Sequence, residues 1–574
     1  MYRLSSPSGS VTAVVDLCDD SQHLAIEREG RPVVHPSPIG LDAPLHGAGE
    51  VVDVTQDERH VAESFETPYG KRREHTYEAE ATTFASTFAD GTEAELDVYV
   101  SDDGVAYRRR VPEIGSVLLR AERGGFELPT RATGWLTPYA VNHEATVRRV
   151  PLSMADGEFC TPGLFEIRDD DWVLLAEAGV DANYHAARLH SQPEDPAVSF
   201  VHPGPEPGDR PVRVTGTFET PWRVAIVGDL GTIVESDLVP ALSDGPAIGD
   251  TDWIEPGRVA WSWWSESASP TDVDRQREYV TYAAERGWEY VLVDEGWDEA
   301  WIPDLVEDAA ERDVGVFLWA HWTDLHGADE RRELLDRWCE WGIDGVKIDF
   351  MDSDEQGMLQ FYEAVLADAA ERELLVNFHG STVPLGLRRK WPNVMTYEGV
   401  QGAEHLKWAT LTPEHNVALP YTRNVVGPMD YTPVTFSADS RHTTAGHELA
   451  LSVVFESGLQ HFADNIDEYA ARPHAEWFLE RVPAAWDETR FLRGRPGSEA
   501  TLARRRGQAW FVGCIVAGVG RTIDLAATFL DDAREGVLLR DGENGSLERT
   551  TAHLGPETPL SVDVPANGGF VLSL

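Results

Sequence analysis

The chain has 574 residues, 42% of them hydrophobic and 9% aromatic, which is more chain than one core usually organises, so we expect two or three domains. Its 99 acidic residues outnumber its 48 basic residues, which gives a net charge of −51. This balance excludes nucleic acid as a partner, because phosphate binding needs a cationic surface. Only four basic residues are lysines, and with the charge this predicts a halophilic protein whose self-repulsion is screened by salt.

The cysteines and the apolar segments bear on compartment and partners. Four cysteines, Cys18, Cys160, Cys339 and Cys514, lie far apart without a CxxC or CxxH pattern, which argues against zinc and against a disulfide framework. No segment reaches the about 20 apolar residues of a membrane span, and the first residues lack the features of a signal peptide. We therefore expect a cytoplasmic protein with no membrane partner, either a monomer or a small homo-oligomer.

Residues 1–247 predict an N-terminal β-sandwich. Apolar and polar positions alternate there with the two-residue period of antiparallel strands that bury one face. The clearest runs are 11–15, 94–100, 105–111 and 212–218. A segment rich in Gly, Asp and Pro, 243–252, follows and is typical of a linker.

Residues 248–490 predict a central (β/α)8 TIM barrel, because compact apolar runs alternate with amphipathic stretches of helical period. The predicted strands are 258–264, 290–294, 315–319, 345–350, 374–378, 394–397, 419–422 and 460–463. The predicted helices include 272–286, 329–341 and 354–371. Short strands such as 509–516 and 569–574 then predict a small antiparallel β domain over 491–574.

Polar residues end most of the predicted barrel strands, where barrel enzymes place their reactive groups. These residues include Trp264, Asp294, Glu295, Trp297, Lys347, Asp349, His379 and Arg423. Indoles, carboxylates and one lysine resemble a carbohydrate pocket and are candidate substrate contacts. The chain has no GxxxxGK[ST] loop, no GxGxxG after a strand and no GxSxG elbow, which argues against nucleotide and acyl-transfer chemistry.

Glycoside cleavage needs two carboxyl groups, and Asp349 and Glu404 are the candidate pair. Asp349 ends an apolar run two residues after Lys347, so both side chains point to one side and the ammonium keeps the carboxylate ionised, as a nucleophile requires. Glu404 is the candidate acid/base. Two structural alternatives stay open: Asp349 as a helix N-cap, and Lys347 as a partner in a salt bridge.

A second concentration of carboxylates lies at residues 398–404. Glu398 and Glu404 are six residues apart around two glycines, which permit a tight loop that turns both carboxylates inward. This arrangement suits a hard cation such as Ca²⁺. The alternative is a solvated acidic loop in a chain rich in acids.

Six segments together resemble glycoside hydrolase family 97: VAWSWW (259–264), LVDEGW (292–297), VKIDFMD (346–352), VNFHG (376–380), WPNVMTYEGVQGAE (391–404) and LPYTRN (419–424). The resemblance implies the same three-domain order. Inverting members carry a glutamate base where this chain has Gly380, whereas retaining members carry a nucleophile where it has Asp349. It therefore implies retention, with carboxyl groups about 5–5.5 Å apart rather than about 6.5–9.5 Å.

The resemblance also implies a metal and a substrate class. Ca²⁺ is expected near the acid/base, held by Glu398, Glu404 and, from the sandwich, Glu144. Retaining members are similar to α-galactosidases, so the expected activity is exo-hydrolysis of terminal α-galactosidic bonds in an oligosaccharide or glycoside. The expected contacts to the sugar are Trp264, Asp294, Glu295, Trp297, Lys347, His379 and Arg423. The alternatives are an α-glucosidase of the same family and a non-catalytic carbohydrate-binding protein.

Overall fold

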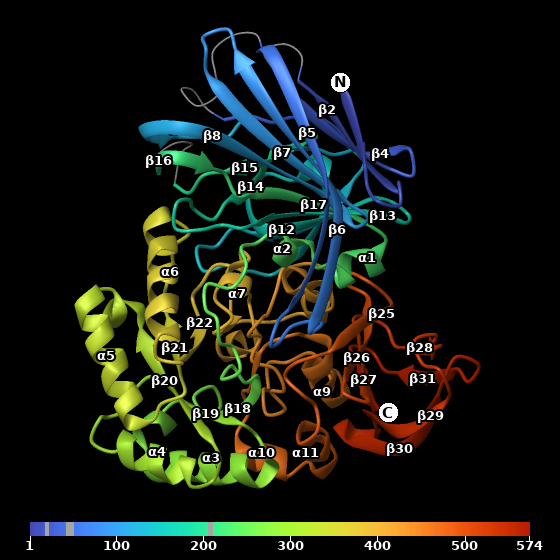
Figure 1. Cartoon of the computed structure of the whole chain (residues 1–574). Helices are drawn as coiled ribbons and strands as arrows, with labels where there is room; N and C mark the ends of the chain where they lie inside the picture. The colour runs from blue at the N-terminus through green and yellow to red at the C-terminus, as the bar shows by residue number, and fades with distance from the viewer. Residues whose placement is uncertain (18–21, 42–50, 205–209) are drawn as a thin grey trace.

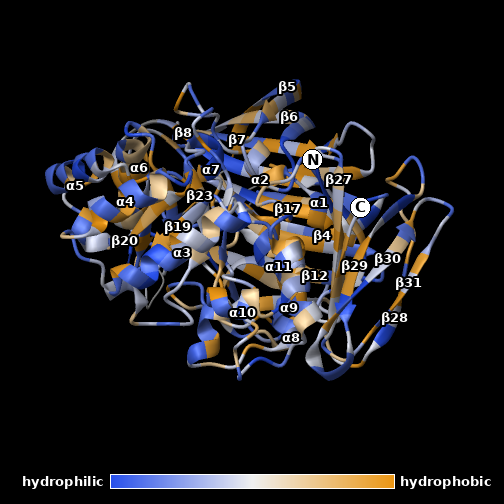
Figure 2. Ribbon diagram, turned by 90° about the horizontal axis from the view of Figure 1, so that it is seen from below, coloured by the Kyte–Doolittle hydropathy of each residue, from blue (hydrophilic) through white to orange (hydrophobic). Residues whose placement is uncertain are grey.

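A computed structural model describes residues 1–17, 22–41, 51–204 and 210–574. Figure 1 shows an N-terminal β domain above a barrel-like α/β domain, with a small C-terminal β domain beside the barrel. The hydropathy colouring of Figure 2 places apolar strands inside and hydrophilic surface on outer helices such as α5 (Ala328–Trp341). No helix of the described part is long and apolar enough to cross a membrane. Cys160, Cys339 and Cys514 are free, and Cys18 lies outside the described residues.

The N-terminal domain is a β-sandwich of antiparallel strands, as predicted. Along β2 buried positions alternate with half-buried ones, and Ile26, Phe84 and Phe165 meet in the core between the layers. Its strands are β1 (Tyr2–Ser5), β2 (Val11–Asp16), β3 (His23–Arg28), β4 (Arg31–Pro38), β5 (Val51–Glu66), β6 (Glu74–Phe88), β7 (Glu93–Ser101), β8 (Gly104–Leu119), β9 (Gly125–Glu127), β10 (Thr133–Pro138), β11 (Arg148–Pro151), β12 (Gly157–Arg168), β13 (Asp171–Ala178), β14 (Arg188–Ser191), β15 (Ala197–Val201), β16 (Val212–Glu219) and β17 (Trp222–Gly228).

The barrel-like domain contains a parallel sheet of seven strands in the order β23-β22-β21-β20-β19-β18-β24 among the described residues. Its strands are β18 (Gly257–Trp261), β19 (Tyr290–Val293), β20 (Gly315–His321), β21 (Gly345–Asp349), β22 (Leu375–Phe378), β23 (Val394–Tyr397) and β24 (Leu459–Phe462). The helices of this part of the chain are α1 (Leu230–Glu235), α2 (Leu238–Ala241), α3 (Val273–Arg286), α4 (Ile302–Ala310), α5, α6 (Gln356–Ala370), α7 (Leu387–Lys390), α8 (Pro413–Ala418), α9 (Ala445–Val454), α10 (Ile466–Ala470) and α11 (Pro473–Leu479).

Helix α3 illustrates how local sequence sets an element of the barrel. The side chain of Asp272 accepts hydrogen bonds from the amides of Asp274 and Arg275 and so caps the first turn. Gly287 ends the helix in the left-handed conformation. The chain then enters β19 after a few residues, which places α3 between two neighbouring parallel strands.

The prediction of a strand at 419–422 is wrong. Residues Leu419–Tyr421 form the short 3-10 helix η5, and Arg423–Val425 form a second one, η6. Pro420 lies in the first turn of η5, where its missing N–H is tolerated, whereas a central strand would need that donor. The eighth strand of the predicted barrel is therefore absent from the described residues.

An irregular segment occupies the gap between β23 and β24. The amide of Asp430 donates to the carbonyl of Tyr397 at 2.9 Å, so the segment runs along β23 without forming a strand. Thr432 and Val434 have φ values of 53° and 71°, which are incompatible with an extended strand. The carbonyl of Pro433 accepts a hydrogen bond from the amide of Ala463, directly after β24, at 3.3 Å, so backbone hydrogen bonds connect this segment to both edges of the nearly closed sheet.

The C-terminal domain is an antiparallel β domain, as predicted. Its strands are β25 (Glu488–Arg495), β26 (Glu499–Arg506), β27 (Ala509–Val516), β28 (Arg521–Leu525), β29 (Arg534–Asp541), β30 (Leu547–Leu554), β31 (Leu560–Val564) and β32 (Gly569–Ser573). The first of these strands begins at Glu488, inside the range that the sequence analysis assigned to the barrel. Helix α9 packs against β27 and β32, which joins this domain to the barrel.

A buried lysine joins the three domains. The Nζ atom of Lys71, near the tip of the β5–β6 hairpin, donates to the carbonyls of Val234 (3.1 Å), Ser236 (2.6 Å) and Val425 (3.0 Å). Its own carbonyl accepts a hydrogen bond from Thr489 of the C-terminal domain. Burial lowers the pKa of Lys71 to about 8.

We expect Lys71→Met to lower the free energy of unfolding by about 3 kcal/mol, because three buried carbonyls lose their donor. Denaturant unfolding followed by tryptophan fluorescence measures the change. Lys390→Met is the matched control, since Lys390 forms a partly exposed pair with Glu363 at 2.7 Å and its loss should cost less than about 1 kcal/mol. Equal losses for the two variants would contradict the role of Lys71.

Candidate active site

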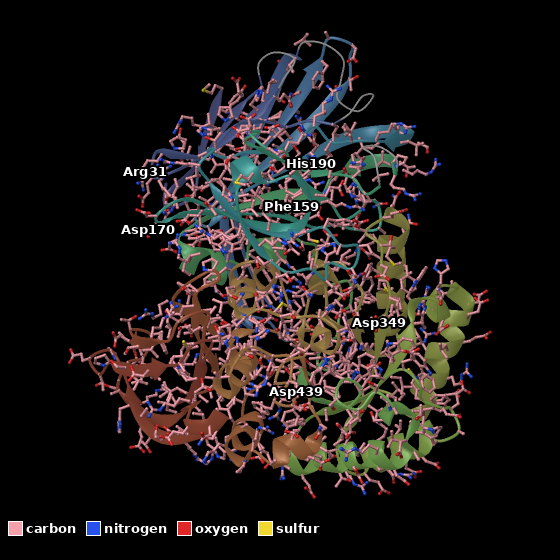
Figure 3. The ribbon with its side chains drawn as sticks, turned by 180° about the vertical axis from the view of Figure 1, so that it is seen from behind. Arg31, Phe159, Asp170, His190, Asp349 and Asp439 are labelled. Carbon is pink, nitrogen blue, oxygen red and sulfur yellow. The ribbon has the colours of Figure 1, made fainter. Side chains whose placement is uncertain are left out.

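Asp349 lies at the carboxyl end of β21, in the upper part of the barrel toward the sandwich (Figure 3). Its Oδ2 accepts a hydrogen bond from Trp319 Nε1 at 3.0 Å, and its Oδ1 accepts one from the amide of Phe350 at 2.6 Å. Lys347 Nζ lies 3.9 Å from Oδ2. The hydrogen-bond partners of this carboxylate are an indole N–H and a backbone N–H, and its ion-pair partner is an ammonium group.

Lys347 connects Asp349 to Asp294 at the base of the site. Its Nζ lies 2.9 Å from Asp294 Oδ2 and 4.7 Å from the ring centroid of Trp261, whose indole N–H also donates to Asp294. Burial opposes the ammonium charge, but the carboxylates of Asp294, Glu404 and Asp349 outweigh burial and raise the pKa of this lysine. Burial would raise the pKa of Asp294, and the lysine instead lowers it.

Three further carboxylates lie at the other side of the mouth, from Glu144, Glu398 and Glu404. Burial raises the pKa of each of them, to about 8 for Glu144 and well above the usual value for Glu398. A hydrogen bond with Glu398 lowers the pKa of Glu144. Neighbouring carboxylates raise the pKa of Glu398 and Glu404 further, whereas Lys347 and His379 lower the pKa of Glu404. Glu404 therefore retains a proton more readily than an exposed glutamate does.

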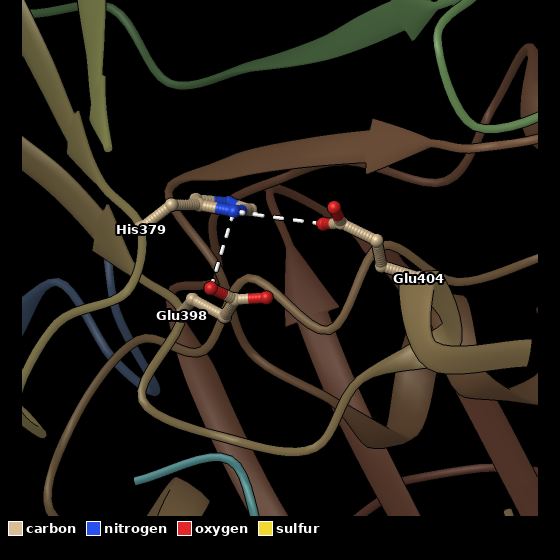
Figure 4. Close-up of side chains that lie close together, drawn as sticks. All are labelled: His379, Glu398 and Glu404. Atoms are coloured by element: carbon tan, nitrogen blue, oxygen red, sulfur yellow. Dashed lines mark ion pairs between the residues drawn. The ribbon is translucent and has the colours of Figure 1, made fainter. Parts of the chain in front are cut away.

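His379 stands between two of these carboxylates, as Figure 4 shows. Its Nδ1 lies 3.3 Å from Glu398 Oε2 and 3.7 Å from Glu404 Oε2, and its Nε2 lies 2.8 Å from Asp430 Oδ2. Asp430 also lies 3.0 Å from His461. Burial alone would lower the pKa of His379, but Glu398 and Asp430 raise it to about 9.

The cluster His379, Glu398 and Glu404 has the composition of a metal site, with ligand atoms within 4.8 Å of one another. Glu404 Oε2 is buried and has no hydrogen-bond partner, which is a vacant acceptor of the kind that a cation fills. Glu144 reaches the same cluster from the loop between β10 and β11, and its side chain contacts both Glu398 and His405. The residues present therefore fit a divalent cation.

Several predicted substrate contacts form hydrogen bonds to the backbone of the site. Trp264 donates its indole N–H to the carbonyl of Glu404 at 3.2 Å, and Trp297 donates to the carbonyl of Trp319 at 2.9 Å. The guanidinium of Arg423 is buried and donates to five backbone carbonyls, including those of Glu398 and Gly399. These hydrogen bonds hold the backbone at Trp319, Glu398 and Glu404.

The remaining predicted contacts reach the mouth itself. Asp294 and Lys347 lie buried at its base, and the Glu295 side chain is exposed. His379 belongs to the carboxylate cluster. The structure thus brings together the predicted residues of both the nucleophile side and the metal side.

Sequence reasoning missed Trp319, Asp430 and His461. A signal existed for Trp319, because it is the last residue of the strand predicted at 315–319. Asp430 lies in a segment without periodicity, and nothing local in the sequence indicates its contacts.

Gly380 lies in close contact with the backbone of Phe350. Its φ is 54°, and a Cβ there would lie 3.0 Å from Phe350 Cα and 3.1 Å from Phe350 N. The carbonyl of Gly380 accepts a hydrogen bond from the amide of Asp352 at 2.8 Å. The loop after Asp349 therefore occupies the space that a longer side chain at position 380 would need.

We expect the metal-free protein to lose stability as the pH rises from about 6.5 to about 9. Glu144 and His379 have pKa values of about 8 and about 9 in the folded chain, both above their unfolded values, so the folded state binds more protons in this window. Thermal unfolding in chelator at several pH values measures this. Glu144→Gln should flatten the dependence, and an added divalent cation should stabilise most at high pH. A melting temperature that is constant over this range would contradict the prediction.

Three family models match the chain: "Glycosyl-hydrolase 97 N-terminal" over 4–245, "Glycoside hydrolase 97" over 253–400 and "Glycosyl-hydrolase 97 C-terminal, oligomerisation" over 485–574. The chain is 40% identical to a "Probable retaining alpha-galactosidase" of Streptomyces bingchenggensis, over 95% of this chain and 88% of that protein. It is 27% identical to a "Retaining alpha-galactosidase" of Bacteroides thetaiotaomicron, over 100% of this chain and 96% of that one. A solved beta-arabinopyranosidase is similar with a TM-score of 0.93 and 26% identity, and the match covers 100% of both chains. The chain therefore belongs to glycoside hydrolase family 97.

Proposed function

We propose that this glycoside hydrolase cleaves terminal α-galactosidic bonds with retention of configuration, using Asp349 as nucleophile and Glu404 as acid/base. The observation that carries the proposal is the contrast between the two carboxyl groups. Asp349 accepts hydrogen bonds from Trp319 and from an amide, whereas burial raises the pKa of Glu404. Two carboxyl groups in unlike surroundings can divide the roles of nucleophile and acid.

In the first step, the Asp349 carboxylate attacks the anomeric carbon while the bond to the glycosidic oxygen breaks. Glu404 donates its proton to that oxygen, and the leaving sugar departs as an alcohol. A covalent galactosyl ester of Asp349 remains. In the second step, Glu404 takes a proton from water, the oxygen of this water attacks the anomeric carbon, and the ester bond breaks. Two inversions give net retention.

The surroundings of Gly380 support retention over inversion. Inverting members of the family carry a glutamate at this position, where it serves as the base. Here the backbone of Phe350 lies 3.0 Å from where a Cβ would be, so a glutamate would displace the loop that follows Asp349. The nucleophile loop and a base at position 380 thus compete for one space.

The names of the relatives support galactose as the sugar. Two curated relatives are named retaining alpha-galactosidases, and a β-L-arabinopyranoside is an α-D-galactoside without its hydroxymethyl group. Asp294 and Lys347, both buried at the base of the site, offer an acceptor and a donor to neighbouring hydroxyls. An α-glucosidase is the second candidate, because the family that this chain resembles also contains α-glucosidases.

We further propose that the divalent cation is Ca²⁺, held by Glu144, Glu398 and Glu404. All three offer oxygen ligands, and burial together with neighbouring carboxylates raises their pKa values. Bound there, the ion would supply positive charge that balances these carboxylates. Glu144, Glu398 and Glu404 would then hold the ion, while Trp264 keeps the Glu404 backbone in place.

We also propose that the protein is adapted to high salt and is located in the cytoplasm. The net charge of −51 and the scarcity of lysine support a protein adapted to high salt. A cytoplasmic location is our inference from the sequence.

Proton NMR of the first product tests both the sugar and the stereochemistry. We expect the enzyme to hydrolyse nitrophenyl α-galactoside faster than nitrophenyl α-glucoside, and to release α-galactose before mutarotation. Release of β-galactose would contradict retention, and preference for the glucoside would favour the second candidate.

Azide rescue tests the two roles separately. We expect Asp349→Ala and Glu404→Ala each to lower kcat by at least about 10³-fold on a substrate that needs protonation. Azide should then give the β-galactosyl azide with Asp349→Ala, because it attacks from the face of the lost nucleophile, and the α-galactosyl azide with Glu404→Ala. Asp439→Ala, which alters an acid outside the cluster, is the control. The opposite pairing of products would reverse the assignment.

A further inference from the structure

One aromatic side chain at the active-site rim has no role in the mechanism above. All 19 tryptophans lie within the described residues, and among them only Trp408 is exposed, with 59% of its surface accessible. An exposed indole forgoes the free energy of burial that the other tryptophans gain. Because Trp408 follows the proposed acid/base Glu404 by four residues, its exposure points to a role at the active site.

Trp408 is held in one orientation. Its indole N–H donates to His405 Nδ1 at 3.2 Å, and its backbone amide donates to the carbonyl of the same histidine at 3.0 Å. The other ring nitrogen of His405 lies 2.8 Å from Glu144 Oε2. The polar edge of the indole is therefore satisfied within the protein, and its exposed apolar surface remains available to a ligand.

The segment that carries Trp408 also carries the acid/base. The 3-10 helix η4 (Ala403–Lys407) contains Glu404 and ends directly before Trp408. Lys407 Nζ fastens this helix by donating to the carbonyl of Trp263 at 3.0 Å and to Ser267 Oγ at 2.6 Å. Glu404 and the indole therefore keep a constant relation to each other.

The chemistry of the first step determines which part of the substrate lies next to Glu404. The acid must reach the glycosidic oxygen, so the leaving group lies on the side of Glu404, beyond the galactose. A leaving pyranose has a flat face of C–H groups, which packs on an indole and leaves its hydroxyls in water.

The geometry points to Trp408 as the platform for the leaving sugar, an inference that rests on the proposed function. The ligand is the pyranose unit to which the terminal galactose is attached. His405 orients the platform and connects it to Glu144 of the sandwich domain. The enzyme is accordingly built for oligosaccharides rather than for galactosides with small leaving groups.

Two substrates distinguish binding of the leaving sugar from a general effect on catalysis. A galactosyl-α-1,6-glucose disaccharide has a leaving sugar, and α-galactosyl fluoride has none. We expect Trp408→Ala to lower kcat/KM for the disaccharide about tenfold more than for the fluoride, equivalent to about 1.4 kcal/mol. Trp408→Phe retains a flat ring and should recover most of the difference. Transfer of galactose to added glucose should fall in parallel in Trp408→Ala, because the acceptor binds on the same surface.

Trp477→Ala is the matched control. Trp477 lies on α11 beneath the guanidinium groups of Arg481 and Arg549, and its loss should leave the ratio of the two substrates unchanged. Equal losses for both substrates in Trp408→Ala would overturn the inference and assign the indole to support of Glu144 or to a contact between subunits. A wild-type enzyme that cleaves neither galactoside would refute the proposed function, and this inference with it.

Discussion

The active site depends on a shortage of positive charge. Several carboxyl groups influence one another at a single barrel mouth, and the described residues that face them with positive charge are few. The carboxyl groups include those of Glu144, Asp294, Asp349, Glu398 and Glu404. Lys347, His379 and Lys407 supply positive charge that opposes them. Because burial limits screening by water, the pKa of each acid depends on its burial and on the positions of these cations.

Lys347 and His379 occupy different parts of the mouth. Lys347 lies at the base, 2.9 Å from Asp294 and 3.9 Å from Asp349, and it lowers the pKa of Asp294 and of Glu404. His379 lies 3.7 Å from Glu404 and is shared with Glu398 and Asp430. Burial outweighs both cations at Glu404 and raises its pKa. The unlike surroundings of Asp349 and Glu404 support the roles proposed for them.

The sequence predicted the elements whose cause is local. Period-two alternation located sandwich strands, and the acid after an apolar run located Asp349 at the end of β21. The apolar run that contains Pro420 was predicted as a strand. It folds as a 3-10 helix. The sequence could not predict the contacts of Asp430 or the hydrogen bonds from Arg423 to backbone carbonyls. Both depend on segments that meet only in the folded chain.

The sandwich contributes Glu144 to the carboxylate cluster of the barrel through the loop between β10 and β11. Tyr139 of this loop donates to Asp354 of the barrel at 2.9 Å, and Arg188 pairs with the same carboxylate at 2.8 Å. At the other end, Thr146 donates to the side chain of Gln401 at 2.5 Å. Both ends of the loop are thus fastened to the barrel, so Glu144 enters the carboxylate cluster at a fixed position. The pKa values of the acids in this cluster therefore depend on residues of two domains.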